Sequence, residues 1–227
     1  EETIRSVLMQ GYPNLEYIVL DGCSTDNTSS ILNRYRDEIT HCVIEPDRGQ
    51  SDALNKGFKL ATGEILAWLN SDDCYLPETL YRVAIAFDLY KADMLAGGCQ
   101  LREGFSRTIF RTHHTALPLG EVVPLPLDRL LDLDHCWQKG EFFYQPEVFW
   151  TRELWQRTGG KVDDKLFYSM DYELWVRMAY HNAQAIHIPD SITLFRLHEK
   201  QKTYGDEIPF LPELRSVCEY YQQKIHE

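Results

Sequence analysis

The fold can be read from Ile65-Leu66-Ala67-Trp68-Leu69-Asn70-Ser71-Asp72-Asp73-Cys74, in which an apolar run ends in an amide, a hydroxyl and two adjacent carboxylates. Residues 64–69 are nearly all apolar, which predicts a strand buried on both faces of a sheet. Adjacent carboxylates repel each other and resist burial unless a cation offsets them. Asp72 and Asp73 are therefore either solvated turn residues that cap the next helix or part of a site that holds a cation.

The first hundred residues alternate strand and helix patterns. Strands are predicted at residues 15–20, 41–45 and 64–69, and helices at the start of the chain and at residues 27–35, 50–61 and 77–90. Such alternation favours a parallel sheet with helices on both faces, in which ligands bind beyond the carboxyl ends of the strands. Asp21, Asp47 and the segment Asn70 to Asp73 each follow a strand end, so we expect them to converge on one site.

The second half of the chain is less regular. Strands are predicted at residues 94–101, 108–110, 185–188 and 191–197, with Pro189-Asp190 as the turn between the last two, and residues 113–126 are predicted to be a loop. Helices are predicted at residues 128–133, 151–158, 171–180 and 209–225. No repeat or linker separates the halves, so we expect residues 1–101 and 102–227 to share one globular domain. The aromatic residues between 137 and 155 are interpreted as core, with a sugar-stacking platform as the alternative.

Composition narrows the classes of function. The chain has 227 residues and a net charge of −12, from 23 Lys and Arg against 35 Asp and Glu, which argues against a nucleic-acid or anionic-lipid partner. A phosphate ligand would then need a metal ion. The six cysteines are scattered without a C-x-x-C pair, which is typical of a reducing, cytoplasmic setting. No apolar run approaches the roughly 18 residues of a membrane span.

Single polar residues leave alternatives open. Asp26 is interpreted as a helix cap, whereas Asp21, at a strand terminus, is better placed to accept hydrogen bonds from a base or ribose. Asp171 begins a helix and is either its cap or a catalytic base, two roles that are compatible. His198 follows a strand and is either structural or a metal ligand. The pair His113-His114 is predicted to be solvated.

Several motifs, taken in order, resemble glycosyltransferase family 2. They are LEYIVLDGCSTDNT at residues 15–28, EPDRGQSDALNKG at 45–57, ATGEI at 61–65 leading into Asn70-Ser71-Asp72-Asp73, QPEVFW at 145–150 and MDYELW at 170–175. The resemblance spans nearly the whole chain. It implies an α/β fold of the GT-A (Rossmann-like) type, with a mostly parallel sheet flanked by helices and a smaller acceptor-side portion. It also implies inverting transfer of a sugar from a nucleotide diphosphate sugar to a hydroxyl acceptor.

The same resemblance implies residue roles. Residues 1–101 would bind the nucleotide sugar, and residues 102–227 would bind the acceptor and carry the general base, Asp171. The implied nucleotide-sugar residues are Asp21, Asp47, Arg48, Asn55, Asn70 and Ser71; the metal ligands are Asp72, Asp73 and His198; and the acceptor-side residues are Gln145 and Trp175. The implied cofactor is Mn²⁺ or Mg²⁺. The expected donor is a UDP-sugar and the expected acceptor a glycan or lipid-linked sugar, in the synthesis of a surface polysaccharide at the inner face of the membrane.

The chain departs from the family pattern in two places. Asn70 replaces the first aspartate of the Asp-x-Asp motif, and Met170 stands where many members have Glu. The family's first strand is also expected to precede Glu1. These departures keep a second hypothesis open, a non-catalytic module that binds a nucleotide or sugar. A nucleotidyltransferase is less favoured, because it needs a Gly-rich, basic phosphate loop that this sequence does not show.

Overall fold

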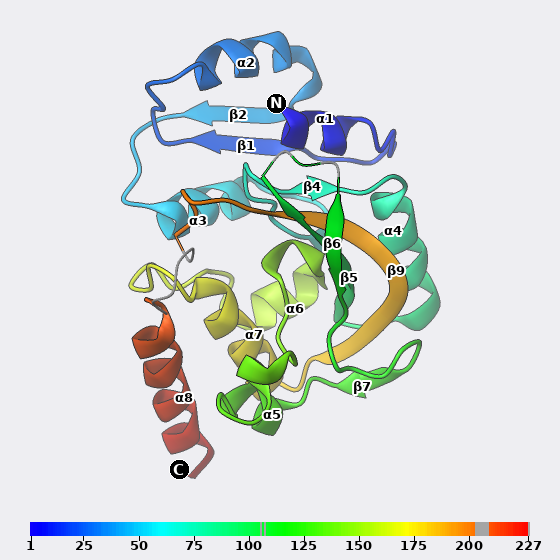
Figure 1. Ribbon diagram of the computed structural model, residues 1–227, viewed down its shortest axis with the longest axis vertical. Helices are drawn as coiled ribbons and strands as arrows, with labels where there is room; N and C mark the ends of the chain where they lie inside the picture. Colours follow the sequence, from blue (N-terminus) through cyan, green and yellow to red (C-terminus); the bar gives the residue numbers. More distant parts are fainter. Residues whose placement is uncertain (105, 107, 203–208, 227) are drawn as a thin grey trace.

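The structure is a computed structural model that describes residues 1–104, 106, 108–202 and 209–226. Helix α1 (Glu2–Leu8), strand β1 (Ile18–Asp21), helix α2 (Thr28–Arg34) and strand β2 (His41–Ile44) lie together at one end of the molecule (Figure 1). A short 3₁₀ helix (Arg36–Glu38) precedes β2, and β1 and β2 pair in parallel. Ile4, Leu32 and Ile39 form the small core of this unit.

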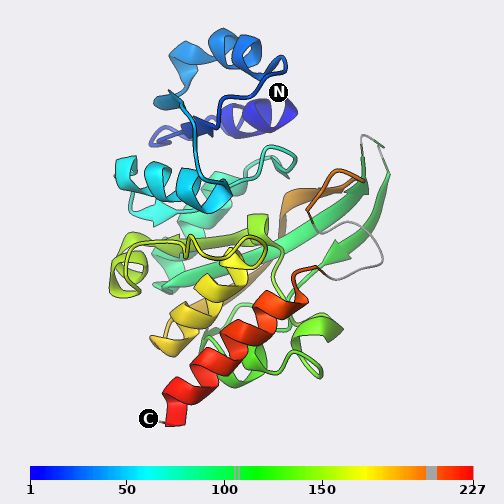
Figure 2. The ribbon, with the colours of Figure 1, turned by 90° about the vertical axis from the view of Figure 1, so that its left-hand side faces the viewer.

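Helix α3 (Gln50–Leu60) packs closely against β1. Gly57 permits this approach, because a Cβ atom at this position would lie 2.5 Å from the Cδ1 atom of Leu20. The helix follows β2 and leads to β3, so the expected strand–helix alternation is present over this part of the chain. Figure 2 shows α3 between the β1–β2 unit and the rest of the molecule.

A larger sheet forms the centre of the molecule, in the order β3-β8-β5-β9-β4, with β6 paired to β5 and β7 paired to β9. Its strands are β3 (Ile65–Leu66), β4 (Cys74–Tyr75), β5 (Met94–Glu103), β6 (Ile109–His113), β7 (Val122–Pro124), β8 (Val148–Thr151) and β9 (Gln184–Leu197). Among the described residues, no strand of this sheet pairs with β1 or β2. The expectation of a further strand ahead of Glu1 stays a prediction.

The α/β class is confirmed, but the expectation of a mostly parallel sheet needs correction. Among the paired strands of the described residues, β1–β2 and β5–β9 are parallel, whereas β3–β8, β5–β8, β5–β6, β4–β9 and β7–β9 are antiparallel. A parallel neighbour requires a crossover of a dozen or more residues. The short connection from β5 to β6 can only reverse the chain, and the regular strand–helix alternation does not continue into the second half.

Two local predictions in the second half were wrong. The expected turn at Pro189-Asp190 lies inside the single strand β9, where the pairing with β5 shifts register between Ala96 and Cys99. Irregular pairing of this kind tolerates a proline, which has no N–H to donate to a neighbouring strand. Strand β7 lies inside the expected loop at residues 113–126 because it pairs with β9.

The described residues also form the α-helices α4 (Thr79–Tyr90), α5 (Leu127–Leu131), α6 (Arg152–Arg157), α7 (Met170–Tyr180) and α8 (Leu211–His226), and two short 3₁₀ helices at Trp137–Lys139 and Gln145–Glu147. The main core contains Phe143, Trp150 and Trp155, which confirms the core interpretation for these members of the aromatic cluster, together with Trp68 and Trp175 from outside the cluster. This core draws on both halves of the chain, and the expected division between residues 101 and 102 falls within β5. None of the described helices is long and apolar enough to cross a lipid bilayer.

His113 is buried rather than solvated. Its side chain is 2% exposed, its Nε2 atom lies 3.5 Å from Oε1 of the fully buried Glu147, and its ring stacks on Phe142. The sequence prediction failed because the carboxylate is 34 residues away along the chain. Burial lowers the pKa of His113 and raises that of Glu147.

Candidate active site

A cavity of about 1640 Å³ lies between the β1–β2 unit and the larger sheet. One part of its wall is apolar and includes Leu20, Leu66 and Val83. The polar part includes six of the residues predicted for the site: Asp21, Asn70, Ser71, Asp72, Gln145 and Asp171. The structure therefore brings the strand ends and the start of α7 to one cavity. The other predicted residues, Asp47, Arg48, Asn55, Asp73, Trp175 and His198, lie outside its lining.

Asp21 ends β1 and is 8% exposed. Its carboxylate accepts hydrogen bonds from the backbone N–H of Ser24, at 3.0 Å, and from the Ser24 hydroxyl, which orient it at the turn. Asp47 approaches the same turn: a Cβ atom at Gly22 would lie 2.4 Å from its Oδ2 atom. The absence of a side chain at Gly22 thus lets the loops after β1 and β2 meet.

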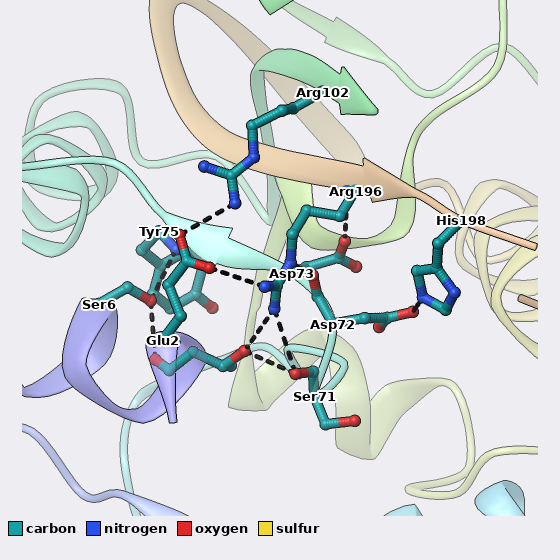
Figure 3. Close-up of polar contacts among 10 residues, drawn as sticks. Glu2, Ser6, Ser71, Asp72, Asp73, Tyr75, Arg102, Arg196 and His198 are labelled. Atoms are coloured by element: carbon teal, nitrogen blue, oxygen red, sulfur yellow. Dashed lines mark hydrogen bonds and ion pairs between the residues drawn. The ribbon is translucent and has the colours of Figure 1, made fainter. Parts of the chain in front are cut away.

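The loop after β3 presents Asn70 and Asp72 to the cavity. The Oδ1 atom of Asn70 accepts a hydrogen bond of 2.8 Å from Gln50, whose own Oε1 atom accepts one of 3.0 Å from the Lys202 ammonium. The Oδ2 atom of Asp72 lies 3.0 Å from Nε2 of His198 (Figure 3). The two side chains are 32% and 34% exposed, so both remain accessible to a ligand.

Asp73 differs sharply from its neighbour. It is 0% exposed, and its Oδ1 atom accepts the backbone N–H of Arg196 at 3.2 Å. Burial, reinforced by the nearby Asp72, raises the pKa of the Asp73 carboxyl to about 8. Its Oδ2 atom has no hydrogen-bond partner within the described residues. The adjacent carboxylates thus occupy different environments, one accessible and one in the interior.

Asp171 is the second residue of α7 and accepts the N–H of Tyr172 at 2.8 Å. Desolvation raises the pKa of its carboxyl to about 6. The segment before it is fixed by Glu213, whose carboxylate accepts the N–H groups of Phe167, Tyr168 and Ser169 at 2.8 to 2.9 Å. Its neighbour Met170 is 5% exposed and belongs to the core, an environment that suits a thioether and not the Glu of many family members.

The remaining predicted residues make structural contacts. Gln145 donates a hydrogen bond of 2.7 Å to the Trp68 carbonyl, and Trp175 stacks on the Trp68 ring within the core, with ring centres 6.0 Å apart. Arg48 pairs with Asp52 at 2.9 Å. Asn55 exchanges two hydrogen bonds with the backbone of residue 162, at 2.9 and 2.8 Å. The roles predicted for these residues stay predictions.

Sequence reasoning missed Gln50, Lys202 and Arg196, which contact the predicted site residues. Gln50 begins α3 directly after Gly49, and a first-turn side chain there can reach a neighbouring loop. Arg196 and His198 are two residues apart at the end of β9, a spacing that places two side chains on the same face of an extended chain. The Arg-x-His pattern next to an acidic loop was the available signal for Arg196.

The donor set around Asp72 fits a hard divalent ion. In the part of the chain that the structure describes, no three His, Cys, Asp or Glu residues converge, so the protein offers Asp72 and His198 as a pair. Mg²⁺ and Mn²⁺ are commonly held by one or two carboxylates, with phosphate and water oxygens completing the shell.

Comparison with known families agrees with this geometry. The model of glycosyl transferase family 2 matches residues 1–154. The chain belongs to glycosyl transferase family 2. The match includes β1, β2, α3 and the Asn70–Asp73 loop, and it ends before Asp171.

Relatives extend the likeness over more of the chain. An uncharacterized glycosyltransferase of Rickettsia typhi is 28% identical over 205 residues, which cover 89% of this family 2 chain and 61% of the relative. The solved structure of Staphylococcus aureus TarS in complex with UDP has a TM-score of 0.68 at 21% identity, covering 96% of this chain and 59% of that one. The mannosyltransferase PcManGT of Pyrobaculum calidifontis, solved with GDP-Man and Mn²⁺, has a TM-score of 0.61 at 18% identity, covering 100% and 60%. The fold is GT-A, as expected, and the chain spans about three fifths of the length of these proteins.

Proposed function

We propose that the protein is an inverting, metal-dependent glycosyltransferase that moves a sugar from a nucleotide diphosphate sugar to a hydroxyl acceptor. The observation that carries this proposal is one cavity lined by Asp21, Asp72 and Asp171, in a chain that belongs to family 2. The three carboxylates differ in environment: Asp21 is held by a turn, Asp72 faces an imidazole, and Asp171 is desolvated. Different environments suit different chemical roles.

Asp21 would accept hydrogen bonds from the base or ribose of the donor. Asp72, with His198, would hold a divalent ion, which when bound neutralises the diphosphate and stabilises it as a leaving group. Asp73 was predicted as a further ligand, but its burial and its bond to Arg196 support a structural role in shaping the loop. Asn70 would contribute only a hydrogen bond, because its amide carries no charge. Gln50 already orients this amide.

Asp171 would remove the proton from the acceptor hydroxyl as that oxygen attacks the anomeric carbon from the side opposite the leaving group. With a pKa of about 6, the carboxylate is mostly ionised at neutral pH and is a stronger base than an ordinary aspartate. Glu213 keeps the segment before Asp171 in place through three backbone N–H groups. Gln145 and Trp175 would act on the acceptor side, Trp175 from behind the cavity wall.

The donor and acceptor classes rest on relatives. TarS, named a poly(ribitol-phosphate) β-N-acetylglucosaminyltransferase, is solved with UDP and with UDP-GlcNAc, and PcManGT is solved with GDP-Man. We infer that this protein takes a nucleotide diphosphate sugar, with a UDP-sugar favoured, and glycosylates a glycan or lipid-linked acceptor in surface polysaccharide synthesis. Its place of action would be the cytoplasm, at the inner face of the membrane.

A second candidate is a non-catalytic module that binds a nucleotide sugar. Asn70 and Met170 favour it, because each removes a carboxylate that many family members have. The test is release of UDP from UDP-sugars with Mn²⁺, with and without a hydroxyl acceptor, in the wild type and in Asp171→Asn. Release in the wild type that falls at least a hundredfold in the variant supports transfer. Binding of the UDP-sugar without turnover in the wild type identifies the binding module.

A further inference from the structure

Arg196 donates hydrogen bonds to the loop that carries Asp72. It lies near the end of β9, is 6% exposed, and points its guanidinium at the loop (Figure 3). Its Nε atom donates to the Asp72 carbonyl, and its Nη2 atom donates to the Ser71 carbonyl at 3.4 Å. Its backbone N–H donates to the Asp73 carboxylate at 3.2 Å. One residue therefore contacts three consecutive positions of the loop.

The other end of the guanidinium is anchored to α1. Its Nη1 atom pairs with the Glu2 carboxylate at 2.8 Å, and its Nη2 atom lies 3.3 Å from the Thr3 hydroxyl, which itself donates to the Ser71 carbonyl at 2.7 Å. Glu2 also accepts from Arg102 on β5 at 2.9 Å. Figure 3 shows Glu2 between the two arginines. The buried positive charge of Arg196 is thus compensated, as a buried ion requires.

The same strand end holds the Asp72 side chain. His198 follows Arg196 by two residues and contacts the Asp72 carboxylate at 3.0 Å, while Arg196 contacts the Asp72 backbone. The main chain and the side chain of Asp72 are therefore both held by residues at the end of β9 and directly after it. Arg196 itself is 6% exposed, and its guanidinium is directed at the loop and at Glu2.

We propose that Arg196, with Glu2 as its counter-ion, is a positioning residue that sets the Asp72 carboxylate against His198 and so forms the ion-binding pair. The role of the Asp72–His198 pair in binding an ion rests on the proposed function. A guanidinium suits the task because it presents several donors in a rigid plane, and the loop and Glu2 are contacted from different edges of it. A lysine keeps the charge but offers one compact ammonium, which cannot reach all of these acceptors together.

The test compares Arg196→Lys and Arg196→Met with the wild type and with Arg102→Met. Arg102→Met is the matched control, because it removes another arginine bound to Glu2 but leaves the Arg196–Glu2 pair. Mn²⁺ affinity is measured without turnover, from the electron paramagnetic resonance signal of free Mn²⁺ in the presence of UDP. We expect Kd to rise at least fivefold in Arg196→Lys and at least tenfold in Arg196→Met, and to stay within twofold in Arg102→Met.

A second readout needs no metal. The Cε1–H resonance of His198 in metal-free protein should shift in Arg196→Lys and stay in place in Arg102→Met, because only the first change releases the Asp72 loop. Arg196→Lys serves this purpose even where Arg196→Met fails to fold. A folded Arg196→Lys with a wild-type His198 resonance and wild-type Mn²⁺ affinity overturns the proposal, as does an equal loss in Arg102→Met. If the wild type binds no Mn²⁺, the metal-dependent function is refuted. The His198 Cε1–H resonance, which is measured without metal, then still tests the positioning role of Arg196.

Discussion

Replacement of Asp171 by Asn removes the proposed base while keeping the size of the side chain and its ability to accept the N–H of Tyr172. A positioned general base typically contributes about 10²- to 10⁴-fold to a rate, which corresponds to about 3 to 5 kcal/mol of activation free energy. We expect kcat for transfer to fall by that factor. The Kd for the nucleotide should change by less than about twofold, because the base acts only on the acceptor.

The pKa of Asp171 predicts how strongly kcat/KM depends on pH. With a pKa of about 6, Asp171 is ionised to about nine tenths at pH 7 and to about one tenth at pH 5, so kcat/KM should fall about tenfold between these values. An aspartate with an ordinary pKa near 3.9 would lose less than about a tenth of its ionised form over the same interval. The assay is UDP release at saturating Mn²⁺ and donor, with initial rates measured between pH 5 and 8.

The same shift has a consequence for stability. Because the pKa of Asp171 is higher in the folded protein than in the unfolded chain, the protonated form favours folding, and this contribution is lost as the pH rises through about 6. Asp171→Asn, which stays neutral, should therefore have a higher Tm than the wild type at pH 7. The two Tm values should approach each other near pH 4.

Asp88→Asn is the control for these measurements, because Asp88 is an exposed residue of α4 that pairs with Lys91 at 2.7 Å and does not line the cavity. It should leave the rate, its pH profile and the nucleotide affinity unchanged. Wild-type turnover in Asp171→Asn, or a wild-type rate that stays constant from pH 7 to pH 5, would refute the assignment of Asp171 as the base.

Two further substitutions probe the departures from the family pattern and the aromatic core. Asn70→Asp adds a carboxylate that can still accept from Gln50, so Mn²⁺ affinity measured by calorimetry should rise a few-fold; an unchanged or weaker affinity would place residue 70 outside the ion's reach. Trp175→Ala removes a fully buried ring and should lower the free energy of unfolding in urea by about 3 to 5 kcal/mol. A loss below 1 kcal/mol would contradict the core role, and an acceptor KM that rises in the folded variant would support the acceptor-side role.

The sequence predicted the parts of the fold that depend on local pattern. The helix at residues 50–61 and the strand ending at Asp21 lie where periodicity and turn residues placed them, whereas of the strand predicted at residues 64–69 only Ile65–Leu66 forms a strand. Pairing direction was not predictable, because it depends on partners that are remote in the sequence. Strand β9 illustrates this: its pairing with β5 keeps Pro189 and Asp190 within one strand, against their preference for a turn.

In the candidate site too, features set by local sequence could be predicted, and features set by remote contacts could not. Asp21, Asp72 and Asp171 were recognisable because Asp21 ends a strand, Asp72 follows an apolar run and Asp171 begins a helix, and each of these positions has a local signature. The different environments of Asp72 and Asp73 were not recognisable, because burial of Asp73 depends on Arg196, more than a hundred residues away. The contact between Gln50 and Lys202 was not recognisable either, because the Lys202 ammonium donates to Gln50 Oε1 at 3.0 Å from a segment about 150 residues away.

In the proposed function, Asp72 couples a divalent ion to the nucleotide. The most direct test of this coupling is calorimetric titration of the protein with UDP, with and without Mn²⁺, in the wild type and in Asp72→Asn. We expect Mn²⁺ to lower the Kd for UDP at least tenfold in the wild type and by less than twofold in Asp72→Asn. Equal affinities with and without Mn²⁺ in the wild type, or a full Mn²⁺ effect in the variant, would contradict this role of Asp72.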